Sequence, residues 1–252
     1  MTGIFPLLKK ELMEQLRTYK LLIVGVIFLF FGITTPLTLK YLPEIIELAG
    51  GSGFEIAIPP PTGVQSLLEY AGTVGQIGVL LAVLMAMGSI ANERKNGTAV
   101  ITLSKPVSRA AFVNAKIIGT TLTFLASLFA ASLFCYGYTV WLIGDADLFA
   151  FVGQNILIAL FLVFCLAVTL LFSSVFRSSL AAGGISLGLL IGQAGLSAIP
   201  RIGDFFPGKL LSWGNSMLMG ESNSYWVALI ITVISILTCL YFSQRFLSHR
   251  DI

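Results

Sequence analysis

Six long apolar segments, each free of Asp, Glu, Lys and Arg, alternate with more polar segments along the 252 residues. Each is long enough to cross a hydrocarbon core of about 30 Å as a helix. The alternating ten-residue strands that a membrane β-barrel needs do not occur. The pattern predicts an all-α integral membrane protein with a single transmembrane domain over residues 1–252 and helices near 21–39, 74–92, 117–143, 150–174, 179–199 and 226–244.

The overall composition agrees with this pattern, with 56% hydrophobic and 11% charged residues and a mean hydropathy of +0.93. If both ends of the chain lie on the cytoplasmic side of the cell membrane, twelve of the fifteen Lys and Arg residues fall in cytoplasmic segments. Such a bias sets the orientation of membrane helices, so it predicts a multi-pass protein with both termini in the cytoplasm. The net charge of +3 then reflects topology and does not indicate nucleic-acid binding.

Residues 1–19 precede the first apolar segment and have a helical pattern without the features of a cleaved signal peptide. Apolar side chains recur every fourth residue and charged side chains fill other positions, as in a helix that lies along a membrane surface. The alternative is a cytosolic helix that packs on a soluble partner. The prediction rests on Ile4, Leu8, Leu12 and Leu16 on the apolar side and on Lys9, Lys10, Glu14 and Arg17 on the polar side.

A basic interruption at residues 92–116 reads NERKNGTAVITLSKPVSRAAFVNAK and holds five of the fifteen Lys and Arg residues. Asn96-Gly97 is typical of a turn and is followed by a short apolar run. Pro106 after this run would end any helix that the run forms. A connection between two spans needs only a few residues. The segment therefore predicts a short surface helix that docks a cytoplasmic partner, although its basic residues also set the topology by themselves.

Two connections on the predicted outer side have some structure of their own. In residues 40–73, the sequences EIIEL and VQSLLEY flank three consecutive prolines and predict short helices at the outer surface. Residues 200–225 are amphipathic, which predicts a segment that lies in the membrane interface or dips back into the membrane. An aromatic belt that anchors the loop explains its apolar residues equally well: Phe205, Phe206, Trp213 and Met217.

A row of small residues in the fifth span, Gly184, Gly188 and Gly192, recurs at four-residue spacing. It predicts a smooth helix face that another helix approaches closely. The same segment matches the G-x-S-x-G pattern of hydrolases, but that site needs a histidine partner on a strand-to-helix turn. The only histidine, His249, lies in the C-terminal tail, so a hydrolase is rejected.

The absence of charged side chains from the predicted spans argues against an ion-coupled carrier, which usually places such groups within the membrane. We expect the polar side chains Gln76, Gln154, Asn155 and Gln193 to form hydrogen bonds between helices. The three cysteines fall inside spans and are expected to pack, with no disulfide or metal site. No nucleotide-binding P-loop occurs in the sequence. The sequence therefore predicts no catalytic residue, no bound cofactor and an energy source outside this chain.

These features together resemble the permease subunit of ABC-2-type exporters, over the whole length of the chain. The resemblance rests on the amphipathic N-terminal helix, six spans, and a loop that has Glu93-Arg94, Gly97-Thr98, an apolar run, Pro106-Val107-Ser108-Arg109 and Lys116 in this order. It implies a helix around 98–103 that couples to a separate ATPase, which would bind ATP and Mg²⁺. The coupling residues implied are Glu93, Arg94, Gly97, Thr98, Val100, Ile101, Leu103, Pro106 and Arg109, with Leu8, Lys9, Leu12, Leu16 and Arg17 in an elbow helix.

The resemblance also implies partners: an ABC ATPase, a second permease chain that is identical or different, the lipid bilayer, and an external accessory protein in some cases. The glycine row of the fifth span would then lie near the subunit interface or the transport path. Two alternatives remain beside an export permease. One is a mechanical transmitter that acts on an external protein without moving a solute, and the other is an intramembrane enzyme, for which the sequence has no cluster of polar residues.

Overall fold

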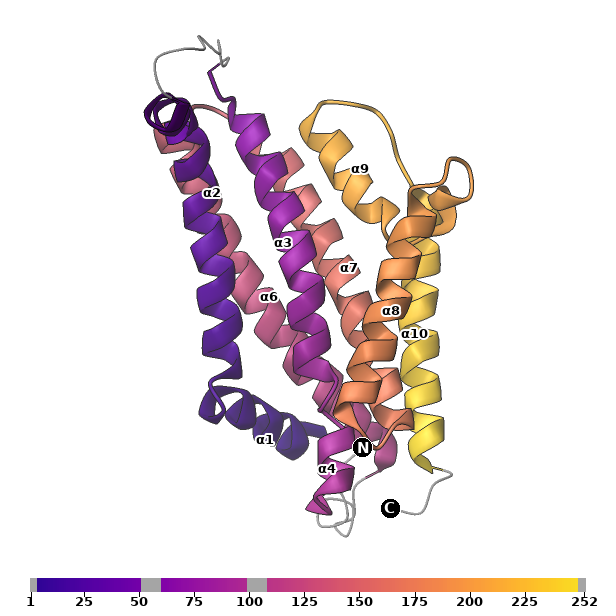
Figure 1. Ribbon diagram of the computed structural model, residues 1–252. Helices are drawn as coiled ribbons and strands as arrows, with labels where there is room; N and C mark the ends of the chain where they lie inside the picture. The colour runs from indigo at the N-terminus through magenta and orange to yellow at the C-terminus, as the bar shows by residue number, and fades with distance from the viewer. Residues whose placement is uncertain (1–3, 51–59, 99–107, 249–252) are drawn as a thin grey trace.

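The computed structural model describes residues 4–50, 60–98 and 108–248, and every regular element in these ranges is helical. Six of the helices are long and apolar enough to cross a membrane, which confirms the predicted all-α membrane fold. They lie side by side in Figure 1. The six are α2 (Lys20–Gly50), α3 (Gly63–Ala86), α6 (Arg109–Leu142), α7 (Leu148–Val175), α8 (Ser179–Ser197) and α10 (Trp226–Ser248).

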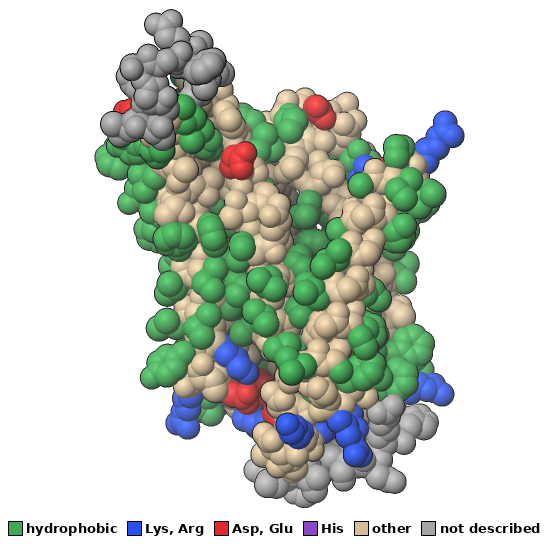
Figure 2. All heavy atoms as spheres, viewed as in Figure 1, with side chains coloured by type: hydrophobic (Ala, Val, Ile, Leu, Met, Phe, Trp, Pro, Cys, Tyr) green, Lys and Arg blue, Asp and Glu red, His purple; other side chains and the backbone are tan. Residues whose placement is uncertain are grey.

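Short elements cover the two ends of this bundle. The helices α1 (Ile4–Arg17) and α4 (Ala91–Lys95) lie at the lower end in Figure 1, where α1 crosses beneath the long helices. The 3-10 turn η1 (Gly203–Phe205) and α9 (Lys209–Leu218) lie at the upper end. Figure 2 shows apolar side chains over the middle of the visible face, and Lys and Arg gathered mainly at the end that holds α1.

The prediction of separate surface helices at EIIEL and VQSLLEY was wrong. The first sequence continues α2 past Pro43, and Figure 1 shows the last turns of α2 turned out of line with the rest of the helix, as expected beyond a proline. The second sequence forms the start of α3, where the Thr62 hydroxyl caps the helix by accepting a hydrogen bond from the Gln65 amide. Ser66 then reaches Thr139 of α6 at 2.9 Å, so this part of α3 belongs to the bundle.

The centre of the bundle is α7, which packs against α3, α6, α8, α9 and α10. Small residues allow close approach: a Cβ added at Gly78 of α3 would lie 2.7 Å from the Leu162 side chain of α7. Cys165 of α7 and Cys135 of α6 are buried and pack within the bundle, as the sequence predicts.

The segment after α8 dips back into the bundle, because α9 packs against α3 and α7. Trp213 is only 5% exposed, so it belongs to the core and not to an interfacial belt, whereas Phe205 is exposed. Gln154 of α7 donates a hydrogen bond to Asn215 of α9 at 2.9 Å, which is one of the interhelical bonds expected from the sequence. Asn155 instead bonds to the Phe151 carbonyl of its own helix.

Candidate functional site

Six charged side chains converge where α1, the start of α2, α4 and α6 meet; we call them the charge cluster. Lys116 of α6 contacts Glu93 of α4 at 2.8 Å and Glu11 of α1 at 3.1 Å. Lys10 also contacts Glu93, at 3.1 Å. Three acidic and three basic side chains balance one another in this charge cluster: Glu11, Glu14 and Glu93 with Lys10, Lys20 and Lys116.

The centre of the charge cluster is withdrawn from solvent, whereas Lys10, Glu14 and Lys20 at its edge are partly exposed. The Lys116 side chain is 2% exposed and that of Glu11 is 5% exposed. Burial lowers the pKa of Lys10, but the carboxylates of Glu93 and Glu11 outweigh burial and raise the pKa above its usual value. In the sequence, Lys116 stands only as a basic residue ahead of the predicted third span. In the structure Lys116 is a buried residue of α6, which begins at Arg109 and so extends on the N-terminal side beyond the predicted span at 117–143.

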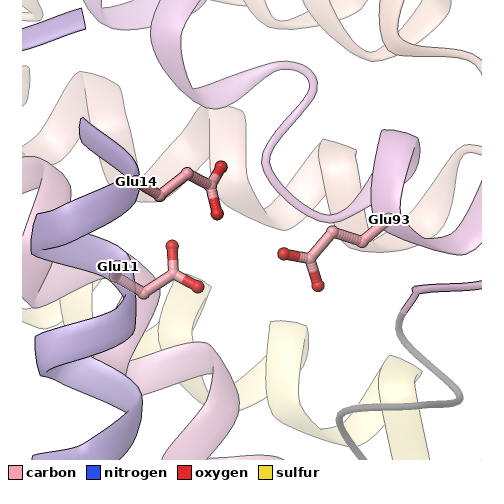
Figure 3. Close-up of side chains that lie close together, drawn as sticks. All are labelled: Glu11, Glu14 and Glu93. Carbon is pink, nitrogen blue, oxygen red and sulfur yellow. The ribbon is translucent and has the colours of Figure 1, made fainter. Parts of the chain in front are cut away.

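The three carboxylates of the charge cluster also satisfy the spacing of a metal site. One oxygen from each of Glu11, Glu14 and Glu93 lies within 4.8 Å of the others, and Figure 3 shows the three carboxylates turned toward one another. Each of them contacts at least one lysine at 4.0 Å or less. The ammonium groups therefore already supply the positive charge, and the arrangement is that of an ion-pair network.

The residues on the two sides of the predicted coupling loop each form a hydrogen bond with the C-terminal end of another spanning helix. Arg94 donates a hydrogen bond to the Ser174 carbonyl at the end of α7, at 2.8 Å. Arg109 donates to the Leu247 carbonyl at the end of α10, at 2.6 Å. Such carbonyls have no partner within their own helix and carry the negative end of the helix dipole, so guanidinium groups stabilise them.

A third tie holds the turn between α3 and α4. The Ser173 hydroxyl of α7 accepts hydrogen bonds from the backbone amides of Ile90 and Ala91 and donates one to the Met87 carbonyl. One buried side chain thus satisfies three backbone groups where the α3 helix stops. A movement of this turn must therefore either carry α7 along or break these hydrogen bonds.

The remaining predicted coupling residues divide into two groups. Gly97 has a φ of +71°, a left-handed turn conformation that glycine adopts without strain, and Thr98 after it is exposed. Val100, Ile101, Leu103 and Pro106 lie outside the described residues, so the predicted coupling helix stays a prediction.

The elbow helix α1 packs on α6 through a face that the sequence analysis did not identify. Leu7, Glu11 and Gln15, spaced four residues apart, are buried. A Cβ at Gly119 of α6 would lie 3.1 Å from the Glu11 Cβ, which shows how closely the two helices approach. The predicted apolar positions lie beside this face: Leu8 and Leu12 are half-buried and Leu16 is exposed, as are Lys9 and Arg17.

The glycine row of α8 makes no close contact within the chain. A Cβ added at Gly184, Gly188 or Gly192 would meet nothing within 4 Å. The neighbouring Gly183 is the one that packs closely, against Met87. The predicted close helix approach at the row is therefore not made by the described part of this chain.

Replacing Arg109 by Ala is expected to lower the free energy of unfolding by about 1 kcal/mol, because the half-buried guanidinium bonds to a helix-end carbonyl. Thermal unfolding of the chain in detergent micelles measures the change. Arg17→Ala, at an exposed position of α1, is the matched control. Equal effects of the two substitutions would show that the Arg109 contact contributes nothing.

Comparison with known proteins gives two further findings. The family model described as ABC-2 family transporter protein matches residues 5–199. The chain is also 28% identical over 249 residues to a protein of Bacillus subtilis (strain 168) described as uncharacterized transmembrane protein YxlG, covering 96% of each. The match includes the elbow helix, the charge cluster and five of the six spans. This chain therefore belongs to the ABC-2 family of transporter membrane proteins.

Proposed function

We propose that this chain is the membrane-spanning subunit of an ATP-binding-cassette exporter and that a separately encoded ATPase drives it. The end of the bundle that holds α1 and α4 faces the cytoplasm and receives the ATPase. The charge cluster is the observation that carries this proposal, because it joins the elbow helix, α4 and the start of α6 on both sides of residues 99–107. The distribution of Lys and Arg supports the same orientation.

The contacts of the loop ends suggest how motion would spread through the protein. A push on residues 99–107 reaches α1 through Glu93 and Lys10, α7 through Arg94, and α10 through Arg109. Because these ties end on rigid helices, the response is a rigid-body displacement and not a local change of the loop. ATP and Mg²⁺ bind only to the ATPase, and their hydrolysis supplies the work.

A second permease chain completes the proposed assembly. The row of Gly184, Gly188 and Gly192 is exposed, with open space where side chains would stand. Rows of this kind let two membrane helices approach closely. The row therefore supports a subunit interface, formed with a second copy of this chain or with a different permease.

Replacing Ile101 by Asp is expected to weaken association with the ATPase by about 2 kcal/mol, as loss of an apolar interface anchor usually does. The same is expected for Leu103→Asp. Membrane insertion should not change, because the six apolar segments are intact. The measurement is co-purification of the tagged chain with a co-expressed ABC ATPase, followed by the ATPase rate of the complex.

The control for this experiment is Ile101→Val, which keeps the apolar character and should retain the complex. Normal association of both Asp variants would exclude residues 101 and 103 as the anchor. If the wild-type chain purified without any ATPase, the proposed function itself would be rejected.

A further inference from the structure

Gln193 of α8 is a buried polar side chain without a hydrogen-bond partner among the described residues. The residue is 7% exposed, and both its side-chain oxygen and nitrogen are buried and unbonded. Leaving a buried donor and acceptor unsatisfied is costly, and proteins rarely do so without a functional reason. An interhelical hydrogen bond is expected here from the sequence, and in the described part of the chain Gln193 makes none.

A cavity of about 430 Å³ lies beside this amide, at the end of the bundle opposite α1. Its walls are apolar and come from α7, α8, α10 and the segment after η1, with Phe164, Leu196, Phe206 and Ile231 among them. Gln193 and Ser235 are the polar side chains in the lining, and no charged side chain is part of it. The volume falls within the range of about 300–1,000 Å³ that is typical of small-molecule sites.

The backbone at Gly208 approaches the side-chain amide of Gln193 closely. A Cβ added at Gly208 would lie 3.0 Å from the Gln193 Nε2 atom and 2.7 Å from the Ser197 hydroxyl. The loop after η1 can therefore cover the amide only because residue 208 is glycine. Leu189 and Leu196, which line the cavity, are exposed on the apolar surface of α8, so the cavity is open toward the membrane.

We propose that this cavity binds an amphiphile with an uncharged hydroxyl or amide group beside an apolar chain. The apolar chain fills the cavity, and the polar group accepts a hydrogen bond from the Gln193 nitrogen and donates one to its oxygen. A charged headgroup is disfavoured because the lining offers no opposite charge. Water is disfavoured because a buried water needs two to four polar partners, and apolar side chains form most of this lining.

This site goes beyond the proposed function and does not depend on the ATPase. Two sources of the same chemistry fit it: a neutral lipid of the bilayer that stays bound, and an amphiphilic compound that the protein transports. Both would reach the cavity from its open side at Leu189 and Leu196. Gly192 of the glycine row also lines the cavity, so a second permease chain seated on that row would form part of its wall.

The test uses the full-length chain in phosphatidylcholine vesicles with two photoreactive probes. One is a monoacylglycerol with a diazirine in its acyl chain, and the other is the methyl ester of the same acid, which has no hydroxyl group. We expect the monoacylglycerol to label the peptides that contain residues 189–196 or 205–207 about tenfold more than the ester, the effect of one buried hydrogen-bonding group. In Gln193→Leu this preference should disappear.

Two controls keep a folding defect apart from a loss of the site. Gln76→Leu makes the same change at an exposed position of α3 and should label as the wild type does. Gln193→Leu without probe should melt at or above the wild-type temperature, because it removes an unpaired buried amide. Equal labelling of wild type and Gln193→Leu, or no preference between the probes, would overturn the proposal.

Adding the ATPase and ATP separates the two sources. If labelling falls only when ATP is present, the bound molecule is a transported compound. If labelling is unchanged, the bound molecule is a resident lipid. Both results support the site. If no ATPase associates with the chain, the proposed function fails while the labelling result still stands.

Discussion

Replacing Lys116 by Met is expected to lower the free energy of unfolding by about 3–5 kcal/mol, the usual cost of removing one partner from a buried ion pair. The substitution leaves the Glu11 and Glu93 carboxylates facing each other with less compensating charge, at positions where Glu11 is 5% and Glu93 14% exposed. Met has nearly the length of Lys, so packing changes little and the effect is electrostatic. Thermal unfolding in detergent micelles measures it.

A second pair of variants separates charge from structure in this experiment. Lys9→Met removes a lysine from an exposed position of α1, and we expect a change within about 0.5 kcal/mol. Combining Lys116→Met with Glu11→Gln and Glu93→Gln should restore much of the stability, since no uncompensated charge then remains at these three positions. If Lys116→Met were as mild as Lys9→Met, the buried network would contribute nothing to the fold.

The charge cluster also matters for the proposed coupling, because in the described part of the chain its ion pairs connect the elbow helix α1 with α4. Without Lys116, the ion pair left to Glu93 among the described residues is the one with Lys10, a side chain that is 40% exposed. Exposed ion pairs contribute little. An ATPase would then displace the loop with less effect on α1.

The architecture could be predicted from the sequence because it depends on local properties. Apolar segments longer than a bilayer is thick have one stable solution, the spanning helix. Helix starts were also encoded locally: Ser108, Asp147 and Ser178 cap α6, α7 and α8 with their side-chain oxygens. The elbow helix was predictable for the same reason, from its own periodicity.

The charge cluster could not be predicted, because its pairs are remote in sequence. Lys116 and Glu11 are 105 residues apart, and Lys10 and Glu93 are 83 apart. Their contact depends on α1 folding back against α6, which no local pattern specifies. In the sequence, Lys116 looks like any basic residue at the end of a span. The buried spacing of Leu7, Glu11 and Gln15 was the available signal, and the apolar row beside it concealed that signal.

The α9 segment was ambiguous for a different reason. Its aromatic and apolar residues suit both the membrane interface and the core of a helix bundle. The choice depends on Gly214, where a Cβ would lie 3.1 Å from the Gln154 Cα, and on the bond from Gln154 to Asn215. Both are contacts with α7, which the sequence of α9 alone does not reveal.

Replacing Gly32 by Ala is expected to lower the free energy of unfolding by about 2–3 kcal/mol, the upper range for overpacking a tight contact. The added Cβ would lie 2.6 Å from the Ala131 carbonyl oxygen and 3.2 Å from the Ala131 Cα. These are backbone atoms of α6, which cannot rotate away, so α2 and α6 would have to separate. Thermal unfolding in detergent micelles measures the loss.

Gly25→Ala is a matched control, because Gly25 also lies on α2 and also faces α6. Its Cβ would lie 3.6 Å from the Ser127 hydroxyl, an ordinary contact, and alanine favours a helix by up to about 1 kcal/mol over glycine. The two identical substitutions should therefore have opposite signs. Equal effects would contradict the close approach of α2 and α6. Opposite effects would show that α2 and α6 are in backbone contact at Gly32 and less tightly packed at Gly25.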